Sequence, residues 1–518
     1  MTTTEIEVFF IKRYGPFPQI YKEGDEMLNF NWMLDGSIVG LYILISLIVG
    51  LLIRKYVKNV DDFLVAGRSV DLYVGMASLA ATEFGIITCM AAAQLGYKYG
   101  FSGATVGLLM AIIMFTVGKT GFCIEPLRKA GVVTIPEFFE KKFGKKVRWA
   151  TGVVIVLGGL LNMGVFLRTG GEFLVYVAGL NPRYLEITMT ILLLIVALYT
   201  IFGGMLSVLV TDYMQFLLMS VGLTLTTFIV FYKIGWNRLF DTVIEKYGEG
   251  GLNPFLNPNL GWQYVLYTAL VLSATVLTWQ TMVSRVLSAK NEKVAKKMYT
   301  RTSFFYIVRS LIPVIWGVTA LTLISLESVG GAPIKAMPKM LSVLLPSGVI
   351  GILVAAMLAA DMSTDSSYLL GWASVIYNDI LIIIHKNSWK EKKAIFVNRV
   401  LVALIGVFLL LYGLWYPLKS DLWVYMTLTA TIYSVSVSTL LIAACYWEKA
   451  NEWGAYAAII IGALTPISFI VAQQVEVLKP YADKIGPYYS GIASFVFTWI
   501  AMIIGSYLKN TFSKKEVK

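Results

Sequence analysis

The chain has 518 residues, of which 57% are hydrophobic and 14% charged, and its formal net charge is +12. A soluble domain carries nearer 25% charged residues, so this composition excludes an ordinary soluble protein. Apolar runs long enough to cross about 30 Å of hydrocarbon recur along the chain, for example at 38–53 and 216–232. Because these runs do not alternate polar with apolar residues, they predict membrane-spanning helices rather than the strands of a barrel.

Thirteen spans are predicted in chain order. Residues 1–35 precede them as an outer segment with no cleavable signal peptide, because residues 1–34 contain five acidic side chains and lack a cleavage site. Residues 509–518 follow them as an inner tail. The predicted spans are 36–54, 71–97, 101–123, 149–178, 184–203, 206–232, 262–287, 302–326, 347–379, 394–416, 420–446, 454–475 and 487–508.

The lysine and arginine residues fix the expected orientation of these spans. Of 43 such residues, 27 fall in the loops on the side of the C-terminus and 13 on the other side. Since basic residues concentrate in cytoplasmic loops, we expect an outer N-terminus and an inner C-terminus in the plasma membrane. The net positive charge is then a signal of topology, and no nucleic-acid partner is implied. The oligomeric state stays open, and a monomer suffices for transport.

Two longer loops carry local structure. The inner segment 124–148 contains Ile135-Pro136-Glu137, and a proline at a helix start followed by an acid predicts a short amphipathic helix at the inner surface. The outer segment 233–261 is rich in glycine, asparagine and proline, which predicts a structured loop built of turns.

Residues typical of enzymes and metal sites are scarce. The three cysteines, Cys89, Cys123 and Cys445, lie in or at the ends of apolar runs, which indicates buried thiols rather than disulfides or metal ligands. The one histidine, His385, stands in a basic loop. No nucleophile–base pairing is visible, so we do not expect an enzyme.

Ionisable side chains inside the spans are costly to bury in a membrane and are therefore functional candidates. Lys119 lies near the inner end of its span and can reach the headgroups. Arg168 and Glu172 are four residues apart, so they form a structural pair unless Arg168 contacts the substrate. The full set is Glu83, Lys119, Arg168, Glu172, Asp212, Arg309, Asp361 and Asp365; Arg309 is expected to pair with Asp361 or Asp365.

Glu83 stands in mid-span among small residues and is followed closely by Gly85. An interrupted helix frees backbone carbonyls, which are ligands for a small hard cation. We therefore expect Glu83 to take part in ion or substrate binding, with a buried structural pair as the alternative.

The run 359–367 forms the second dense polar site. A helix turns about 100° per residue, so Ala360, Ser363, Thr364 and Ser367 share one stripe. The three hydroxyls of this stripe can replace water around sodium. Asp361 and Asp365 point the other way. Hydrogen bonding between helices is the alternative role of the hydroxyls. Asp212 lies at a similar depth, which allows a second cation site between its helix and this one.

These segments resemble the sodium:solute symporter family, which includes bacterial proline, galactose and sialic acid transporters. The resemblance covers about residues 55–450. It rests on five marks in order: 62–68 (Asp-Phe-Leu-Val-Ala-Gly-Arg); 134–139 (Thr-Ile-Pro-Glu-Phe-Phe); Gly203-Gly204 with Thr211-Asp212 and Gln215; Gln280 and Arg285 with 287–290 (Leu-Ser-Ala-Lys); and 344–367.

The resemblance implies the inverted-repeat fold of the leucine transporter. Its repeats would be 71–232 and 262–446, preceded by the helix 36–54 and followed by two helices in 454–508. Substrate would bind between the broken spans 71–97 and 262–287. The resemblance implies a main sodium site of the Ala81, Phe84 and Ala360 carbonyls with the Ser363 and Thr364 hydroxyls, and a second sodium site of Asp212, Ser366 and Ser367.

Departures from the family pattern leave the solute open. Trp279 stands before Gln280 where many members have an aspartate. An acid, an aromatic face and an amide at Glu83, Trp279 and Gln280 suit an amine-bearing or zwitterionic solute, and a sugar pocket is the alternative. The expected function is sodium-coupled import of a small solute by alternating access; proton coupling through Glu83 and a non-transporting sensor are the rivals.

Overall fold

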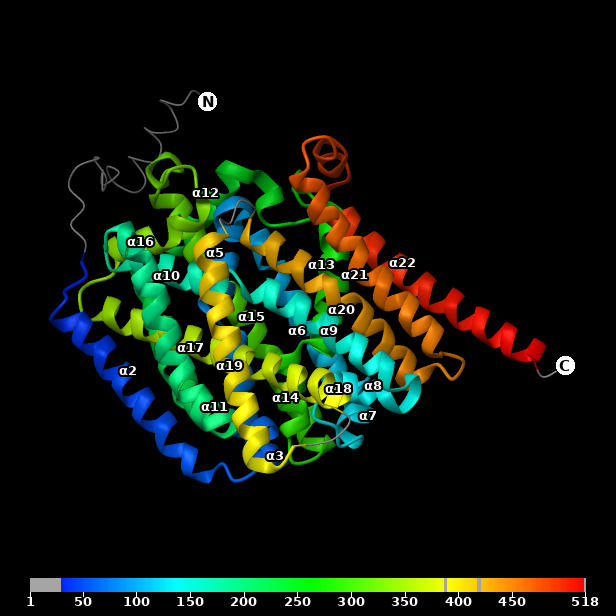
Figure 1. Ribbon diagram of the computed structural model, residues 1–518. Coiled ribbons are helices and arrows are strands. Elements are labelled where there is room, and N and C mark those ends of the chain that lie inside the picture. The colour runs from blue at the N-terminus through cyan, green and yellow to red at the C-terminus, as the bar shows by residue number, and fades with distance from the viewer. Residues whose placement is uncertain (1–28, 386–388, 417–420, 517–518) are drawn as a thin grey trace.

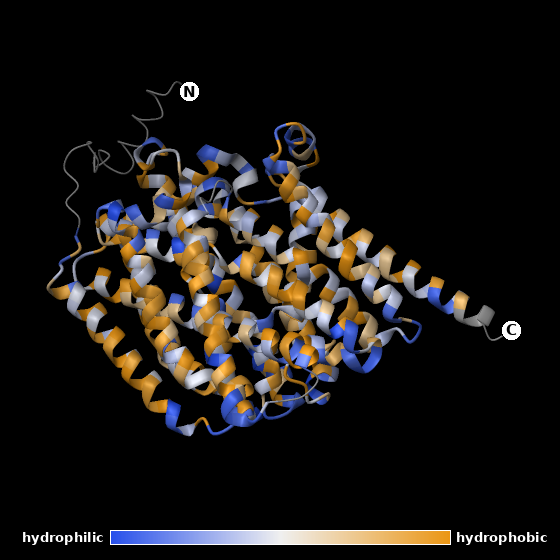
Figure 2. Cartoon of the chain, in the orientation of Figure 1, coloured by the Kyte–Doolittle hydropathy of each residue, from blue (hydrophilic) through white to orange (hydrophobic). Residues whose placement is uncertain are grey.

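The computed structural model describes residues 29–385, 389–416 and 421–516. Long helices run side by side through this part of the chain, with short helices at the two ends (Figure 1). Hydrophobic residues dominate the middle of the long helices, and hydrophilic residues gather toward the ends (Figure 2). These residues form no strand, and one isolated bridge joins Val70 to Ala289. The predicted all-helical fold is confirmed; the outer segment before residue 29 lies outside the described residues.

The helices of the first part are α2 (Leu34–Ile53), α3 (Val60–Val65), α4 (Leu72–Glu83), α5 (Ile86–Tyr99), α6 (Thr105–Thr120), α7 (Ile124–Lys129), α8 (Ile135–Phe143), α9 (Lys145–Met163), α10 (Phe166–Val177), α11 (Leu185–Ile234) and α12 (Trp236–Tyr247). Those of the second part are α13 (Gly261–Thr278), α14 (Gln280–Ser288), α15 (Glu292–Leu323), α16 (Ala336–Leu344), α17 (Val349–Val375), α18 (Ile382–His385), α19 (Glu391–Trp415), α20 (Leu422–Tyr446), α21 (Glu452–Gln474) and α22 (Lys479–Glu516).

Eleven stretches of the described chain are long and apolar enough to cross a membrane. Two of them extend over two predicted spans each: Ile86–Thr120 has 35 residues and Pro182–Ile234 has 53. Each contains a glycine with positive φ, Gly100 at 64° and Gly204 at 53°, where helical geometry is interrupted. The two interruptions fall at the predicted boundaries between adjacent spans. The total of thirteen spans stays a prediction.

Two predicted spans are broken helices, as expected for the first helix of each repeat. α4 ends at Glu83 and α5 begins at Ile86, with Phe84 at φ −105° and ψ 67° between them. A Cβ at Gly85 would lie 2.7 Å from the Thr364 hydroxyl, so only glycine lets α17 approach this break closely. The second break is Trp279, at φ −65° and ψ 118° between α13 and α14.

The surface segments were only partly predicted. The short helix expected in the inner loop is α8, whose N-cap Thr134 accepts a hydrogen bond from the Glu137 backbone. The outer segment 233–261 was predicted to be a structured loop, and α12 occupies its first half, with Leu239 and Val243 buried on its apolar side. α22 continues into the predicted inner tail 509–518 as far as Glu516.

Close packing between α5 and α15 supports a stability prediction. A Cβ on Gly317 of α15 would overlap the backbone carbonyl of Ala93 on α5. We expect Gly317→Ala to cost about 1–3 kcal/mol of stability, because the two backbones must separate. The melting temperature in detergent measures this loss. Gly40→Ala is the matched control, since nothing lies within 4 Å of its Cβ; equal melting temperatures for the two variants would refute the prediction.

Candidate functional site

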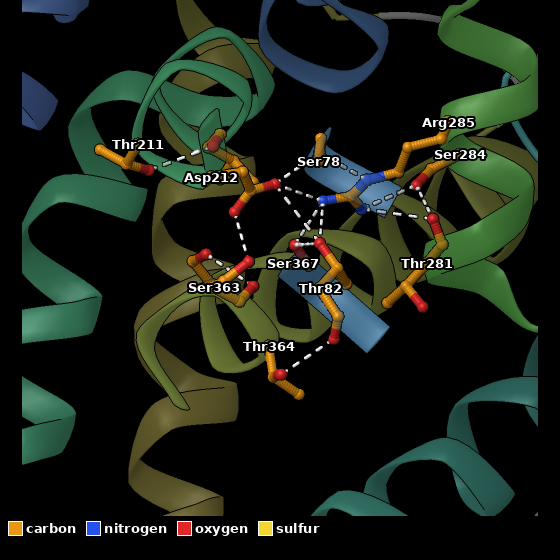
Figure 3. Close-up of polar contacts among 12 residues, drawn as sticks. Ser78, Thr82, Thr211, Asp212, Thr281, Ser284, Arg285, Ser363, Thr364 and Ser367 are labelled. Atoms are coloured by element: carbon orange, nitrogen blue, oxygen red, sulfur yellow. Dashed lines mark hydrogen bonds and ion pairs between the residues drawn. The ribbon is translucent and has the colours of Figure 1, made fainter. Parts of the chain in front are cut away.

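A buried polar network joins four helices around Asp212 (Figure 3). Asp212 lies on α11 and is fully buried. Its Oδ2 accepts hydrogen bonds from Ser78 on α4 and from Arg285 on α14, the latter at 3.0 Å. Its Oδ1 accepts from the Ser363 hydroxyl on α17. The carboxylate therefore connects both broken helices to the helix that carries the hydroxyl stripe.

The Arg285 guanidinium is the centre of this network. Its Nη2 donates to Asp212, to the Thr82 hydroxyl at 2.7 Å and to the Ser367 hydroxyl. Its Nε donates to Ser78 at 3.1 Å. Only 1% of the arginine is exposed, so its charge is compensated almost entirely by these groups and by Asp212.

Of the three residues expected to form a second sodium site, two share a contact with Arg285 and the third does not. Asp212 and Ser367 both contact Arg285, whereas the Ser366 hydroxyl donates to the Ser363 carbonyl of its own helix at 3.1 Å. In this state of the protein a guanidinium thus lies where a second cation was predicted.

The residues expected to form the main sodium site lie on the α4 break and on α17. The Thr364 hydroxyl donates to the Thr82 carbonyl at 2.8 Å, which places it at the broken end of α4. The Phe84 amide still reaches the Ala81 carbonyl at 3.2 Å, and Ala360 and Ser363 are fully buried. The hydroxyl stripe therefore faces the broken helix. Its hydroxyls also make the inter-helix hydrogen bonds that were the alternative role.

Asp361 and Asp365 do not form the predicted ion pair with an arginine in the described structure. Both are 3% exposed, and Asp361 Oδ2 and Asp365 Oδ1 have no hydrogen-bond partner there. A Cβ on Gly170 would lie 2.9 Å from Asp361 Oδ2, so this carboxyl group faces α10. Arg309 instead lies over the Tyr306 ring, at 4.9 Å from its centroid. The Asp361 carboxyl group thus faces α10, whereas Arg309 lies on α15.

A cavity opens beside the two breaks. The space between its lining side chains, including the part open to solvent, measures about 940 Å³. Trp279 forms part of its wall and stacks on Tyr433 with ring centroids 5.6 Å apart. The Trp279 indole also donates to the Tyr368 hydroxyl at 2.6 Å. The polar lining residues are Thr82, Glu83, Thr88, Asn162, Thr275, Tyr306, Arg309, Ser310, Thr364, Tyr368 and Thr427.

Two of the four predicted substrate residues line this cavity. These two residues are Glu83 and Trp279. Gln280 is buried behind the break with both amide atoms unpaired among described residues, and it is not part of the lining. Arg168 is not part of it either, because it pairs with Glu172 at 3.3 Å and donates to the Gly413 carbonyl.

The sequence interpretation missed most of the polar residues of the lining and misplaced Arg309. Asn162, Tyr306 and Ser310 were not singled out, although a polar residue in an apolar span was a visible signal in each case. Arg309 was recognised as an intramembrane charge but was assigned to the wrong partner.

The chain is similar in sequence to known proteins over most of its length. The chain matches the sequence model of the sodium:solute symporter family over residues 63–462. Sodium/glucose cotransporter 4 of Danio rerio is 27% identical over 470 residues, covering 83% of this chain and 70% of that protein. The sodium/glucose cotransporter of Vibrio parahaemolyticus is 25% identical over 482 residues, covering 87% of each.

The structural comparison gives the fold. A Na+-coupled sialic acid symporter, solved in a substrate-bound outward-open state, matches with a TM-score of 0.77 at 20% identity, over 92% of this chain and 97% of that chain. The fold is thus a transporter fold with two broken helices at its centre. With the family match over most of its length, the chain belongs to the sodium:solute symporter family.

Proposed function

We propose that this protein imports a small organic solute together with sodium by alternating access. The observation that carries the proposal is the Thr364 hydroxyl at the broken end of α4, 2.8 Å from a backbone carbonyl. Hydroxyls and freed carbonyls are the hard oxygen ligands that a small cation takes at a broken membrane helix. Membership of a sodium-coupled family makes sodium the cation.

The proposed main sodium site consists of five oxygen atoms on two elements. They are the carbonyls of Ala81, Phe84 and Ala360 and the hydroxyls of Ser363 and Thr364. The proposed second site, Asp212 with Ser366 and Ser367, requires Arg285 to withdraw from Asp212 and Ser367. A coupling ion acts by binding one conformation more tightly than another, so an arginine that competes with it would give the site such a preference.

The proposed solute carries an amine. Glu83 provides a negative charge in the cavity, and Trp279 provides an aromatic face that attracts cations. A sugar is the second candidate, and it is favoured by the relatives, whose names include glucose and myo-inositol cotransporters.

The proposed orientation places the N-terminus outside and the C-terminus inside the plasma membrane. The loops expected to be cytoplasmic contain α3, α7 and α8, which lie at the lower end in Figure 1, whereas α12 and α16 lie at the upper end. This common placement supports the count of basic residues in the loops.

Removing sodium should abolish concentrative uptake. One sodium entering down 100 mV supplies about 2.3 kcal/mol, which supports roughly 50-fold accumulation. We would reconstitute the protein in liposomes and measure uptake from panels of labelled amino acids, amines, hexoses and inositol, with sodium or choline outside at fixed pH. Uptake should occur in sodium and fall to that of protein-free liposomes in choline.

Two controls separate the rivals. Uptake driven by a pH gradient in choline would contradict sodium coupling and favour protons. Solute counterflow without any ion gradient tests transport itself, because a sensor of the same fold would not exchange labelled for unlabelled solute.

A further inference from the structure

The central cavity contains one carboxylate and one guanidinium that are not paired with each other. Glu83 is 6% exposed, and its Oε1 accepts one hydrogen bond, from the Thr281 hydroxyl at 2.8 Å. Arg309 also lines the cavity, where its guanidinium lies over the Tyr306 ring and acts electrostatically on Glu83 without forming a salt bridge to it. No ion pair within 4 Å joins either group to a described partner.

The two charges together restrict the solute. An isolated charge inside a membrane protein is costly, and it is normally paired or hydrogen-bonded. A simple amine would neutralise Glu83 and leave Arg309 without a counter-ion, and a simple carboxylate would do the reverse. A hexose would supply no charge, and the two groups would then compensate each other only across the cavity. A solute with separated positive and negative groups compensates both charges at once.

Unpaired polar atoms in the same cavity also indicate a polar ligand. Tyr306 Oη, Ser310 Oγ and Asn162 Oδ1 are buried, line the cavity and have no hydrogen-bond partner among described residues. Buried polar groups normally have partners, so such a cluster calls for one. Tyr306 and Ser310 lie on α15 within one turn of Arg309, and their hydroxyls are donors suited to a carboxylate.

We propose that the transported solute is a small zwitterion, an amino acid or a betaine, bound by its carboxylate at Arg309 and by its cationic nitrogen at Glu83. Trp279 supplies the aromatic contact to the cationic end. The carbon body fits the apolar part of the lining, which includes Leu95, Val106, Met110, Val271 and Leu272. This inference rests on the proposed function and adds Arg309 as the residue that selects for a carboxylate.

Thermal stabilisation of the purified full-length protein in sodium chloride tests the proposal. The probes are the neutral amino acids and glycine betaine, the decarboxylated amine and the deaminated acid of each amino acid, and glucose, galactose, myo-inositol and sialic acid. We expect at least one zwitterion to raise the melting temperature, with both single-charge analogues binding at least about tenfold more weakly. Binding of a sugar without any zwitterion, or no zwitterion binding at several millimolar, overturns the proposal.

Variants of Arg309 assign the contact. Arg309→Gln should weaken the zwitterion about tenfold or more and leave the affinity of the matching amine nearly unchanged. Arg309→Lys should restore part of the loss, and Lys119→Gln, which removes an exposed cation outside the cavity, should change nothing. An equal loss of affinity for the zwitterion and the amine, or no loss of affinity for either, overturns the role of Arg309.

The stabilisation by sodium alone separates the two proposals. If sodium chloride raises the melting temperature over choline chloride but only sugars bind, the zwitterion inference fails and the sodium symporter stands. If sodium has no effect on stability or on solute affinity, the proposed function itself fails. Retention of the sodium effect by Arg309→Gln also shows that this variant is folded.

Discussion

Asp212→Ala is expected to lower the free energy of unfolding by about 3–5 kcal/mol, because it leaves the charge of Arg285 buried without its counter-ion. The two groups are 3.0 Å apart and have exposures of 0% and 1%. The guanidinium would keep its hydrogen bonds to Thr82 and Ser367, but neither supplies negative charge. The melting temperature of the purified variant in choline chloride measures the loss.

Choline is the informative medium for this experiment. If Asp212 serves chiefly as a ligand of a second sodium ion, the variant should match the parent protein in choline and be less stable only in sodium. If the arginine pair dominates, the variant should be less stable in both media. A melting temperature equal to that of the parent in choline would therefore contradict the structural role assigned to the pair.

Two companion variants make the result specific. Glu476→Ala removes an exposed carboxylate and should change stability by less than about 0.5 kcal/mol. The double variant Asp212→Ala with Arg285→Met removes both charges, and such replacement of a buried ion pair is often nearly neutral. We expect the double variant to be more stable than Asp212→Ala alone, and strictly additive losses would show that the two residues are not coupled.

The parts of the fold predicted from the sequence are those that depend on one helix at a time. Apolar runs identified the spans, and the clustering of small residues around Gly85 identified the first broken helix. Helical periodicity correctly separated the side of α17 that bears Ser363 and Thr364 from the side that bears Asp361. Each of these inferences needs only the local spacing of residues.

The errors concern contacts between helices. Periodicity gives the direction of a side chain relative to its own helix, but not the helix that lies opposite. Arg309 was therefore given a partner on the following span, whereas Arg285 was not connected to Asp212, which lies 73 residues earlier in the chain. α12 was missed for a different reason, since the turn residues after it dominated the local composition.

Thr364→Ala is expected to raise the sodium concentration for half-maximal effect by about 10- to 100-fold. The substitution removes one of the two hydroxyls proposed for the main site, and a hydrogen-bonding group on a charged partner contributes about 1.5–3 kcal/mol. The hydroxyl now donates to the Thr82 carbonyl and lies against Gly85 at the α4 break. Sodium titrations of the melting temperature, at constant ionic strength with choline, give the concentration directly.

Thr364→Ser and Thr200→Ala complete this test of the main site. The serine keeps the hydroxyl and should retain sodium affinity within a few-fold. Thr200 is equally buried, but its hydroxyl bonds the Val196 carbonyl of its own helix, so its loss should leave the sodium titration unchanged. If Thr364→Ala titrates like Thr200→Ala, the hydroxyl serves only to join α17 to α4, and the sodium site must lie elsewhere. If instead only Thr364→Ala shifts the titration while Asp212→Ala loses stability in choline, the broken helix binds the ion and Arg285 occupies the second position.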